Sequence, residues 1–381
     1  MKILLYTNIL SPYRKHFFDA LSKECKSRNI VFKVLVMAES ESNRQWRYDD
    51  YKNDYTELLM SYSVKIKHAF IHYNPELKKA IKSFDPDILI CSGSYFCPGT
   101  WCALKYVNRC TTFFWSESHL GETRKYGLFK NKVRDSIRHS FYRKYDGFLY
   151  AGKLSRELIE KYSKKDCKLI YVPNLIDEMV FAQAYQNPGR LIIKEKYGLL
   201  DKKRTMIIPA RLEKEKGISE FLGLLSKCNN KDDVSVIVAG DGSLKGELEK
   251  KAKEYKIDVT FLGHKNQSEI VELYSAADIF ALPSLSDANP LTTIEALWAG
   301  LPLVVSRHVG NHYENVREGV NGYVIDYDDE ADSIKKLETI ISSDDQWINS
   351  AMHTSRKIAE EIYCTVSNAS RIVDELILTI T

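Results

Sequence analysis

The chain has 381 residues and a mass of 43.9 kDa, more than one hydrophobic core usually serves, so two domains are expected. Hydrophobic residues make up 44% and charged residues 28% of the chain, as in ordinary globular proteins, and no apolar run is long enough to span a bilayer. The formal net charge of +4 is too small to indicate nucleic-acid binding, so we expect no nucleic-acid partner.

The eight cysteines have neither the Cys-x-x-Cys spacing of a zinc site nor the density of a disulfide framework. They indicate reduced thiols in a cytoplasmic protein. The apolar start at residues 1–6 is interrupted by Thr7 and Asn8 and has no signal-peptide cleavage pattern. We therefore interpret it as a first strand.

The first segments of the chain predict a β-α-β unit. Residues 3–6 form an apolar run, apolar side chains recur at helical spacing in residues 17–21, and residues 30–37 form a second apolar run. Such a unit implies a parallel sheet. Because ligands bind beyond the carboxyl ends of parallel strands, the loop at residues 8–14 is either a ligand site or a solvated connector.

Two further strands are expected at residues 85–91 and 111–115. Glu117 and His119 follow the second of them, at its carboxyl end. A lone histidine is most often structural, whereas this position in a parallel sheet is where ligands bind. His119 therefore has two interpretations, a structural one and a ligand-binding one.

The segment 124–144 is strongly basic and has the pattern of an amphipathic helix. Val133, Ile137 and Phe141 lie four residues apart, so a helix would carry an apolar stripe beside a cationic face. This pattern fits a surface that docks on anionic lipid headgroups, and it fits equally a solvated helix whose stripe packs on the sheet. The basic residues, opposed by Asp135 alone, are Arg124, Lys125, Lys130, Lys132, Arg134, Arg138, Arg143 and Lys144.

A weakly patterned segment at residues 183–189 is the expected linker, and strands and helices alternate again after it. Arg211 and Lys216 follow a predicted strand at residues 205–210. An arginine and a lysine at this position suit a diphosphate, although a solvated charged loop is the alternative. The glycines after the next strand, residues 234–239, match a dinucleotide-binding motif incompletely and carry little weight.

Residues 278–302 predict a strand, a turn and a helix. Asn289 offers an N-cap and Pro290 a first helical residue, while Gly300 and Pro302 supply the stop. The start of such a helix presents unpaired amides, here those of Leu291 and Thr292, to a phosphate. Asp287 and Glu295 flank this start; alone, each could be an ordinary turn residue or a dipole-complementing side chain.

The sequence SDANPLTTIEALWAGLPLVVS, residues 286–306, resembles the acidic motif of retaining glycosyltransferases of the GT-B group, family four (glycosyltransferases group 1), of the bacterial surface-polysaccharide type. In that family two glutamates are spaced this way and are followed by Ala, Gly-x-Pro and a short strand. Asp287 stands here for the usual Glu and Ala288 for the usual Gly. The resemblance spans nearly the whole chain and is strongest over residues 206–326.

The resemblance implies an α/β fold of GT-B type, with two doubly wound Rossmann-like domains facing each other across a cleft. Residues 1–182 would form the acceptor-side domain and residues 190–359 the domain that holds the donor. Residues 360–381 would form a helix that returns to the first domain. The implied location is cytoplasmic, with peripheral docking on the inner face of the plasma membrane.

The implied activity is retaining, metal-independent transfer of a sugar from a UDP- or GDP-linked donor to a hydroxyl of a glycan or lipid-linked acceptor, in cell-surface polysaccharide biosynthesis. No cofactor or metal is expected besides the nucleotide-sugar donor. No protein nucleophile is visible, and family members are usually assigned a same-face mechanism assisted by the leaving phosphate.

The resemblance also implies a role for each candidate residue. Asp287, His119 and Lys216 are the candidate catalytic residues. Acceptor binding is expected at Ser11, Tyr13, Arg14 and Glu117. Donor binding is expected at Arg211, Lys216, Gly240, His264, Asp287, Ala288, Asn289, Pro290, Leu291, Thr292 and Glu295.

Two alternatives remain open from the sequence. A nucleotide-sugar epimerase shares this architecture and would act without an acceptor. A non-catalytic sugar-nucleotide-binding protein would bind the donor without transfer or hydrolysis. The presence of Arg211, Lys216 and Glu295 together argues against loss of activity.

Overall fold

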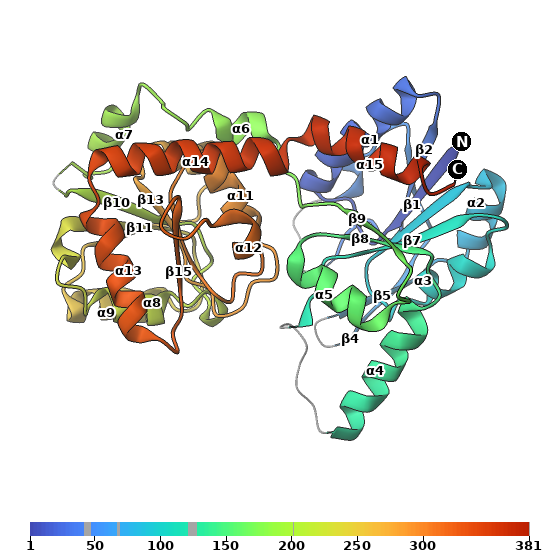
Figure 1. Cartoon of the computed structure of the whole chain (residues 1–381), viewed down its shortest axis with the longest axis horizontal. Helices are drawn as coiled ribbons and strands as arrows, with labels where there is room; N and C mark the ends of the chain where they lie inside the picture. The colour runs from blue at the N-terminus through green and yellow to red at the C-terminus, as the bar shows by residue number, and fades with distance from the viewer. Residues whose placement is uncertain (42–46, 67–68, 121–127, 201, 381) are drawn as a thin grey trace. The chain divides into compact units, whose positions relative to one another are not determined.

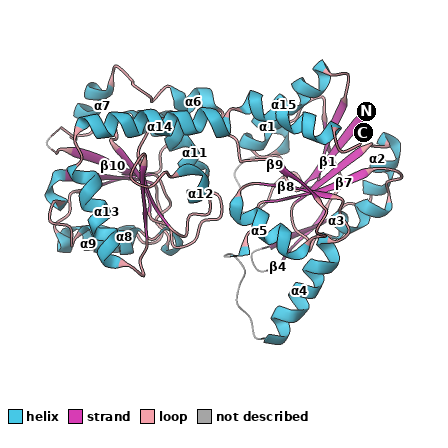
Figure 2. Ribbon diagram, viewed as in Figure 1, coloured by secondary structure: helices cyan, strands magenta, loops and turns pink. Residues whose placement is uncertain are grey.

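The computed structural model describes residues 1–41, 47–66, 69–120, 128–200 and 202–380 and divides into two compact units. Unit 1 comprises Met1–Ile176 with Thr365–Thr381, and unit 2 comprises Asp177–Cys364. Each unit is an α/β structure built on a parallel sheet, as the sequence predicted (Figure 1; Figure 2). The boundaries expected at residues 182 and 360 lie a few residues from these divisions.

Unit 1 contains a sheet of seven strands among its described residues, and every neighbouring pair is parallel. Five of the six residues of the first strand are buried, because helices cover both faces of the sheet. A separate antiparallel hairpin joins β4 (Tyr62–Ile66) to β5 (Ala69–Tyr73). In spatial order the sheet contains β3 (Thr56–Leu58), β2 (Val31–Val36), β1 (Lys2–Thr7), β6 (Ile88–Ser92), β7 (Thr111–Ser116), β8 (Gly147–Tyr150) and β9 (Lys168–Tyr171).

The helices of unit 1 include one from the end of the described chain. Helix α15 (Thr365–Ile377) packs against α1 (Pro12–Ser27), where His16 Nε2 lies 3.2 Å from Thr365 Oγ1 and Arg28 forms an ion pair with Asp374. The last described helix thus belongs to unit 1. The other helices are α2 (Leu77–Phe84), α3 (Pro98–Cys102), α4 (Leu128–Tyr142) and α5 (Lys153–Tyr162).

Helix α4 extends away from the sheet of unit 1, and only its C-terminal part packs on the core (Figure 1). Val133 and Ile137 are 44% and 38% exposed, whereas Phe141 is fully buried against Phe114. The apolar stripe is therefore divided between solvent and core. The prediction that Arg138 belongs to an exposed cationic face is wrong, because its guanidinium is buried beside aromatic rings. Arg124 and Lys125 lie outside the described residues.

Unit 2 contains a six-stranded parallel sheet among its described residues. Its four-residue strands β13 and β14 are buried at every position, so they form the centre of this unit's core. In spatial order the sheet contains β12 (Val259–Gly263), β11 (Val234–Ala239), β10 (Arg204–Ile208), β13 (Ile279–Leu282), β14 (Leu303–Ser306) and β15 (Gly322–Ile325). The helices are α6 (Glu178–Ala182), α7 (Arg190–Lys196), α8 (Ile218–Leu225), α9 (Lys245–Tyr255), α10 (Gln267–Ala276), α11 (Leu291–Trp298), α12 (His312–Asn315), α13 (Glu330–Ser342) and α14 (Asp345–Tyr363).

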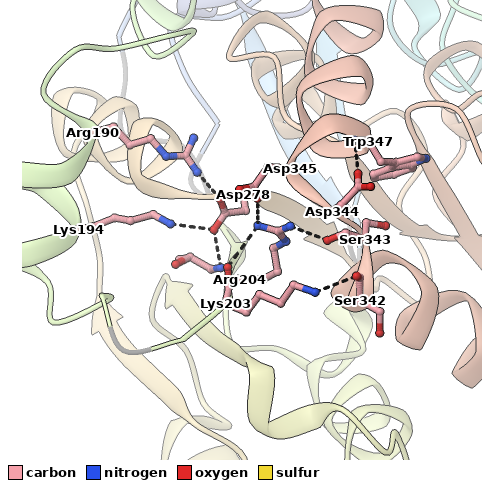
Figure 3. A network of polar contacts seen from close by, with 11 residues as sticks. Arg190, Lys194, Lys203, Arg204, Asp278, Ser342, Ser343, Asp344, Asp345 and Trp347 are labelled. Carbon is pink, nitrogen blue, oxygen red and sulfur yellow. Dashed lines mark hydrogen bonds and ion pairs between the residues drawn. The ribbon is translucent and has the colours of Figure 1, made fainter.

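A polar network fastens the amino end of this sheet (Figure 3). The Asp278 carboxylate accepts the backbone N–H of Thr205 at 2.7 Å and the Lys194 ammonium at 2.9 Å, and it pairs with Arg190. Arg204 donates to Asp345 at 2.8 Å. These bonds attach α7 and the start of α14 to the strands. They all lie at the amino end of the sheet, opposite the carboxyl end where ligands bind in parallel sheets.

The expected linker is part of unit 2. Asn187 donates its side-chain N–H to the Ser275 hydroxyl at 3.2 Å, and helices on both sides of residues 183–189 lie in this unit. Across the described ranges of the chain, no helix is both long enough and apolar enough to cross a membrane.

Candidate active site

Two loops meet at the carboxyl end of the sheet in unit 2, one after β10 and one after β13. The backbone N–H of Leu285 donates to the carbonyl of Glu215 at 2.8 Å. Gly217 has φ +63°, and a Cβ at that position would lie 2.2 Å from the carbonyl oxygen of Pro283. The Tyr327 hydroxyl donates to the same carbonyl at 2.6 Å. The close approach of the loops therefore depends on a glycine.

Lys216 and Asp287, both predicted catalytic residues, are brought together by these loops. Lys216 Nζ lies 2.5 Å from Asp287 Oδ2, and each side chain is 17% exposed. Arg211, the predicted partner of Lys216 on the diphosphate, is 71% exposed and donates to Glu215 at 3.1 Å. The half-buried ion pair is therefore the charged centre of this site, with Arg211 at its solvent side.

The helix that follows Asp287 begins one residue later than predicted. Pro290 is the N-cap residue, with extended φ −67° and ψ 134°, and Leu291 is the first helical residue. Asn289 does not cap the helix as expected, because its side-chain oxygen accepts from Asn311 at 2.9 Å. The first amides of α11, those of Leu291 and Thr292, lie at the positive end of the helix dipole and have no partners within the helix.

A buried set of polar side chains supports this helix start from below. Asn311 donates to the carbonyl of Pro290 at 3.0 Å and to the Thr293 hydroxyl at 2.9 Å. Asn315 donates to the same hydroxyl at 3.0 Å and accepts from Tyr363. Sequence reasoning missed this set. The spacing of Asn311 and Asn315, four residues apart after a glycine, was the available signal.

Glu295 lies inside α11, where its carboxylate accepts the Tyr274 hydroxyl at 2.9 Å. Burial raises the pKa of Glu295 to about 7, and the hydrogen bond from Tyr274 opposes this rise. Tyr274 comes from α10 and was not predicted, because nothing local in the sequence indicates a contact with residue 295.

Three further donor candidates lie on neighbouring loops. Gly240 follows β11, and a Cβ there would lie 2.0 Å from the carbonyl oxygen of Ala210, so a glycine allows the strand ends to pack. A Cβ at Gly310 would likewise lie 1.8 Å from the carbonyl oxygen of Ala288, so a glycine is needed beside Ala288 too. His264 follows β12 and is exposed. The structure places all three at the carboxyl end of the unit 2 sheet.

Unit 1 contains a cavity of about 230 Å³ at the carboxyl ends of β1 and β7. Arg14 Nη2 lies 2.5 Å from Glu117 Oε1, and the guanidinium stacks over Trp115 at 4.3 Å from the ring centroid. The cavity brings all four predicted acceptor residues together with side chains that were not predicted. Its lining consists of Asn8, Ile9, Ser11, Tyr13, Arg14, Gly93, Trp115, Glu117 and Ser118.

His119 follows this cavity's lining by one residue, in the loop after β7. Burial lowers its pKa, which favours the neutral imidazole. His119 belongs to unit 1 and Asp287 to unit 2, so their joint action on one sugar stays a prediction.

Comparisons with known sequences find matches mainly in the second half of the chain. Residues 190–359 match the family model described as Glycosyl transferases group 1. An alpha-monoglucosyldiacylglycerol synthase of Streptococcus pneumoniae is 30% identical over 174 residues, which are 45% of this chain and 38% of that protein. A Campylobacter jejuni enzyme named GalNAc-alpha-(1->4)-GalNAc-alpha-(1->3)-diNAcBac-PP-undecaprenol alpha-1,4-N-acetyl-D-galactosaminyltransferase is 24% identical over 217 residues, 56% of each chain. The chain spans about half the length of the curated relatives it matches.

Solved structures resemble the whole chain at low sequence identity. HepE of Anabaena, in complex with UDP, is 16% identical with a TM-score of 0.74, and the match covers 99% of this chain and 100% of HepE. A sucrose-phosphate synthase of Thermosynechococcus elongatus is 11% identical with a TM-score of 0.72 and full coverage of both chains. These matches show the GT-B fold.

Proposed function

Because residues 190–359 belong to the group 1 glycosyltransferase family, we propose that this protein transfers a sugar from a UDP- or GDP-linked donor to an acceptor hydroxyl, with retention of anomeric configuration. The observation that carries this proposal is the Lys216–Asp287 ion pair beside the start of α11. A cation and the positive end of a helix, placed together, suit a diphosphate.

Each residue of the site then has a role in binding the donor. Lys216 and the amides of Leu291 and Thr292 bind the diphosphate, and Arg211 adds a contact from the solvent side. Glu295, positioned by Tyr274, accepts a ribose hydroxyl. Asp287 lies beside Lys216, so its carboxylate can accept a hydrogen bond from a hydroxyl of the donor sugar while the Lys216 ammonium contacts the phosphate. The loops with Gly240 and His264 receive the nucleotide base.

The proposed chemistry uses the leaving group itself. The acceptor oxygen bonds to the anomeric carbon on the face from which the diphosphate departs, and the departing phosphate oxygen takes the acceptor proton. Lys216 and the α11 amides stabilise the charge that develops on the diphosphate. His119 is proposed to contact the sugar. This scheme needs no protein nucleophile and no metal, so EDTA should leave the rate unchanged.

The donor is best identified by ligand-induced stabilisation of the native state. A panel of UDP- and GDP-linked sugars is added to the full chain, and the rise in melting temperature is measured, since a ligand at 100 times its Kd stabilises a protein by about 2.7 kcal/mol. Lys216→Ala serves as the site control. If no nucleoside diphosphate or its sugar raises the melting temperature of the wild type, the proposed donor class is wrong.

The reaction class is decided by product analysis with the donor so identified. We expect a new glycoside whose anomeric proton coupling matches that of the donor. An isomerised donor formed without acceptor would establish an epimerase. Donor binding with neither transfer nor hydrolysis, across a broad acceptor panel, would establish a non-catalytic binding protein.

We propose an acceptor that is a glycan or a lipid-linked glycan of the cell surface. Two relatives support this, since the pneumococcal protein is named for a diacylglycerol product and the Campylobacter protein for an undecaprenol-linked substrate. Cytoplasmic glycosylation of such an acceptor would require this protein to work at a membrane surface.

Helix α4 is the proposed membrane contact. Lys130, Lys132, Arg143 and Lys144 are exposed along or just after it, and Val133 and Ile137 are exposed among them. Each cation near an anionic surface contributes about 1 kcal/mol at physiological ionic strength, so these four give an upper bound of about 4 kcal/mol. That is enough for reversible, salt-sensitive docking.

Vesicle co-sedimentation tests this contact. The full chain should bind vesicles containing anionic phosphatidylglycerol, should not bind pure phosphatidylcholine, and should be released by salt. The double variant Lys130→Glu/Lys132→Glu should lose binding, whereas Lys78→Glu/Lys79→Glu on the exposed face of α2 should retain it. Equal binding to neutral and anionic vesicles would exclude the proposed electrostatic docking.

A further inference from the structure

The cavity of unit 1 carries no net positive charge, although a guanidinium lines it. Arg14 is 12% and Glu117 30% exposed, and their charged groups lie 2.5 Å apart. A second carboxylate, that of Glu41, lies 3.4 Å from the side-chain nitrogen of Asn8, which also lines the cavity. The positive end of α1 adds roughly half a charge. The formal charge of the cavity is therefore not positive.

The cavity also offers hydrogen-bonding atoms without partners. Arg14 Nη1, Trp115 Nε1 and the Ser11 hydroxyl are buried and have no hydrogen-bond partner within the described part of the chain. The Ser11 residue is only 2% exposed. Arg14 binds one oxygen of Glu117, which leaves the other oxygen as an acceptor. The residues that carry these donors and this acceptor all line the one cavity, and buried polar groups need partners.

The size and the aromatic surface of the cavity limit the ligand further. A volume of about 230 Å³ is below the roughly 300–1,000 Å³ of sites that enclose a drug-sized ligand, so the cavity itself has room for one sugar ring. Arg14 covers the face of Trp115, which leaves polar contacts rather than ring stacking to orient the ligand.

From these observations we infer that the cavity binds an uncharged pyranose ring of the acceptor through two neighbouring hydroxyl groups, one accepting from Arg14 and one donating to Glu117. The inference rests on the proposed glycosyl transfer and deepens it by naming the acceptor's terminal group. A phosphate or carboxylate fits less well, because it would have to displace Glu117 from Arg14 or lie beside a carboxylate.

The indole N–H of Trp115 reports on this cavity directly. The full chain is labelled with ¹⁵N-tryptophan, the resonance is assigned with Trp115→Phe, and methyl α-glucopyranoside, methyl α-galactopyranoside and methyl α-mannopyranoside are titrated into it. We expect at least one of the three to shift the Trp115 resonance in a saturable way. Inorganic phosphate and the methyl glycoside of glucuronic acid should leave it in place.

Charge removal without loss of size distinguishes the ligand classes. Glu117→Gln should weaken the glycoside by about tenfold or more and should admit phosphate, because Arg14 then lacks its counter-charge. Glu160→Gln, at the exposed pair with Arg156 in the same unit, is the matched control and should change neither titration. The inference is overturned if phosphate or the uronate shifts the wild-type resonance, or if no glycoside does.

A titration with UDP-glucose separates this inference from the proposed function. If UDP-glucose shifts the Trp115 resonance while the free glycosides do not, the ring in the cavity comes from the donor and the acceptor assignment is wrong. If UDP stabilises the protein but no sugar affects Trp115, the proposed function stands and this inference fails. If UDP-linked and GDP-linked ligands both fail to bind while a glycoside shifts Trp115, the cavity is a sugar site and the proposed transfer fails.

Discussion

Replacing Glu295 by Gln should stabilise unit 2 and weaken donor binding at the same time. The carboxyl group is buried, and burial raises its pKa from an ordinary value of 4.5 to about 7. In the unfolded chain it ionises near pH 4.5, whereas in the folded chain it stays protonated until about pH 7. Stability is therefore lost as the pH rises from 4.5 to 7 and is constant above that.

The magnitude follows from the two pKa values. A difference of roughly 2.5 units, at 1.36 kcal/mol per unit, gives about 3 kcal/mol at pH 8.5 and under about 1 kcal/mol at pH 5. Glutamine has nearly the same volume and keeps an oxygen to accept from Tyr274, so Glu295→Gln removes the cost of burying charge without emptying the site.

The assay is urea unfolding of the wild type and Glu295→Gln at pH 5 and pH 8.5. Because the chain has two units, the effect should appear in only one of two transitions. Glu254→Gln, on the exposed face of α9, is the control for the loss of one carboxylate. At pH 8.5, where the Glu295 carboxyl is ionised, UDP binding should weaken in Glu295→Gln, because the ribose loses a charged acceptor. A gain in stability of equal size at both pH values would refute the reasoning.

Three further substitutions test the loops of unit 2. Lys216→Ala should reduce transfer by about 100-fold or more with the fold intact, while Lys214→Ala, which is exposed, should not; an active Lys216→Ala enzyme would remove the phosphate assignment. Asp287→Asn releases Lys216 from its ion pair, so calorimetry should show UDP bound at least as tightly while turnover falls; unchanged turnover would mean that Asp287 has no part in the reaction. Gly217→Ala should lower the melting temperature more than Gly198→Ala. Both glycines have positive φ, but only at position 217 would a Cβ lie 2.2 Å from a carbonyl oxygen. Equal losses would show that the loop moves to make room for the Cβ.

The features predicted from sequence are those with a local cause. Apolar runs give the buried strands, and the spacing of Asp287 and Glu295 with Gly300 and Pro302 gives the strand, the turn and most of the helix. The start of that helix was misplaced by one residue because Asn289 has a better partner in Asn311, whose position is set by a different loop. A long-range contact overrides a local cap in this case.

The residues that were not predicted from the sequence make contacts with segments distant in the chain, which no local pattern indicates. Tyr274 is ordinary within α10 and becomes part of the site only because α11 packs on the same sheet. Tyr327 follows β15 yet donates to a carbonyl after β13. Arg138 has the spacing of a surface cation, and the aromatic rings that bury it come from other segments, at Tyr95 and Tyr162.

Because α15 packs against α1, unit 2 is an insertion within the sequence of unit 1. Residues 177–364 are continuous, whereas unit 1 needs both Met1–Ile176 and Thr365–Thr381. On the ribosome, unit 2 can therefore complete its fold before unit 1 does. Until α15 is made, unit 1 exposes the apolar groove between α1 and its sheet, which is lined by Leu21, Cys25 and Phe32. Ile372 and Leu376 of α15 later cover this groove. The first-synthesised unit is therefore the last to be completed, and its apolar groove stays exposed until α15 has been made.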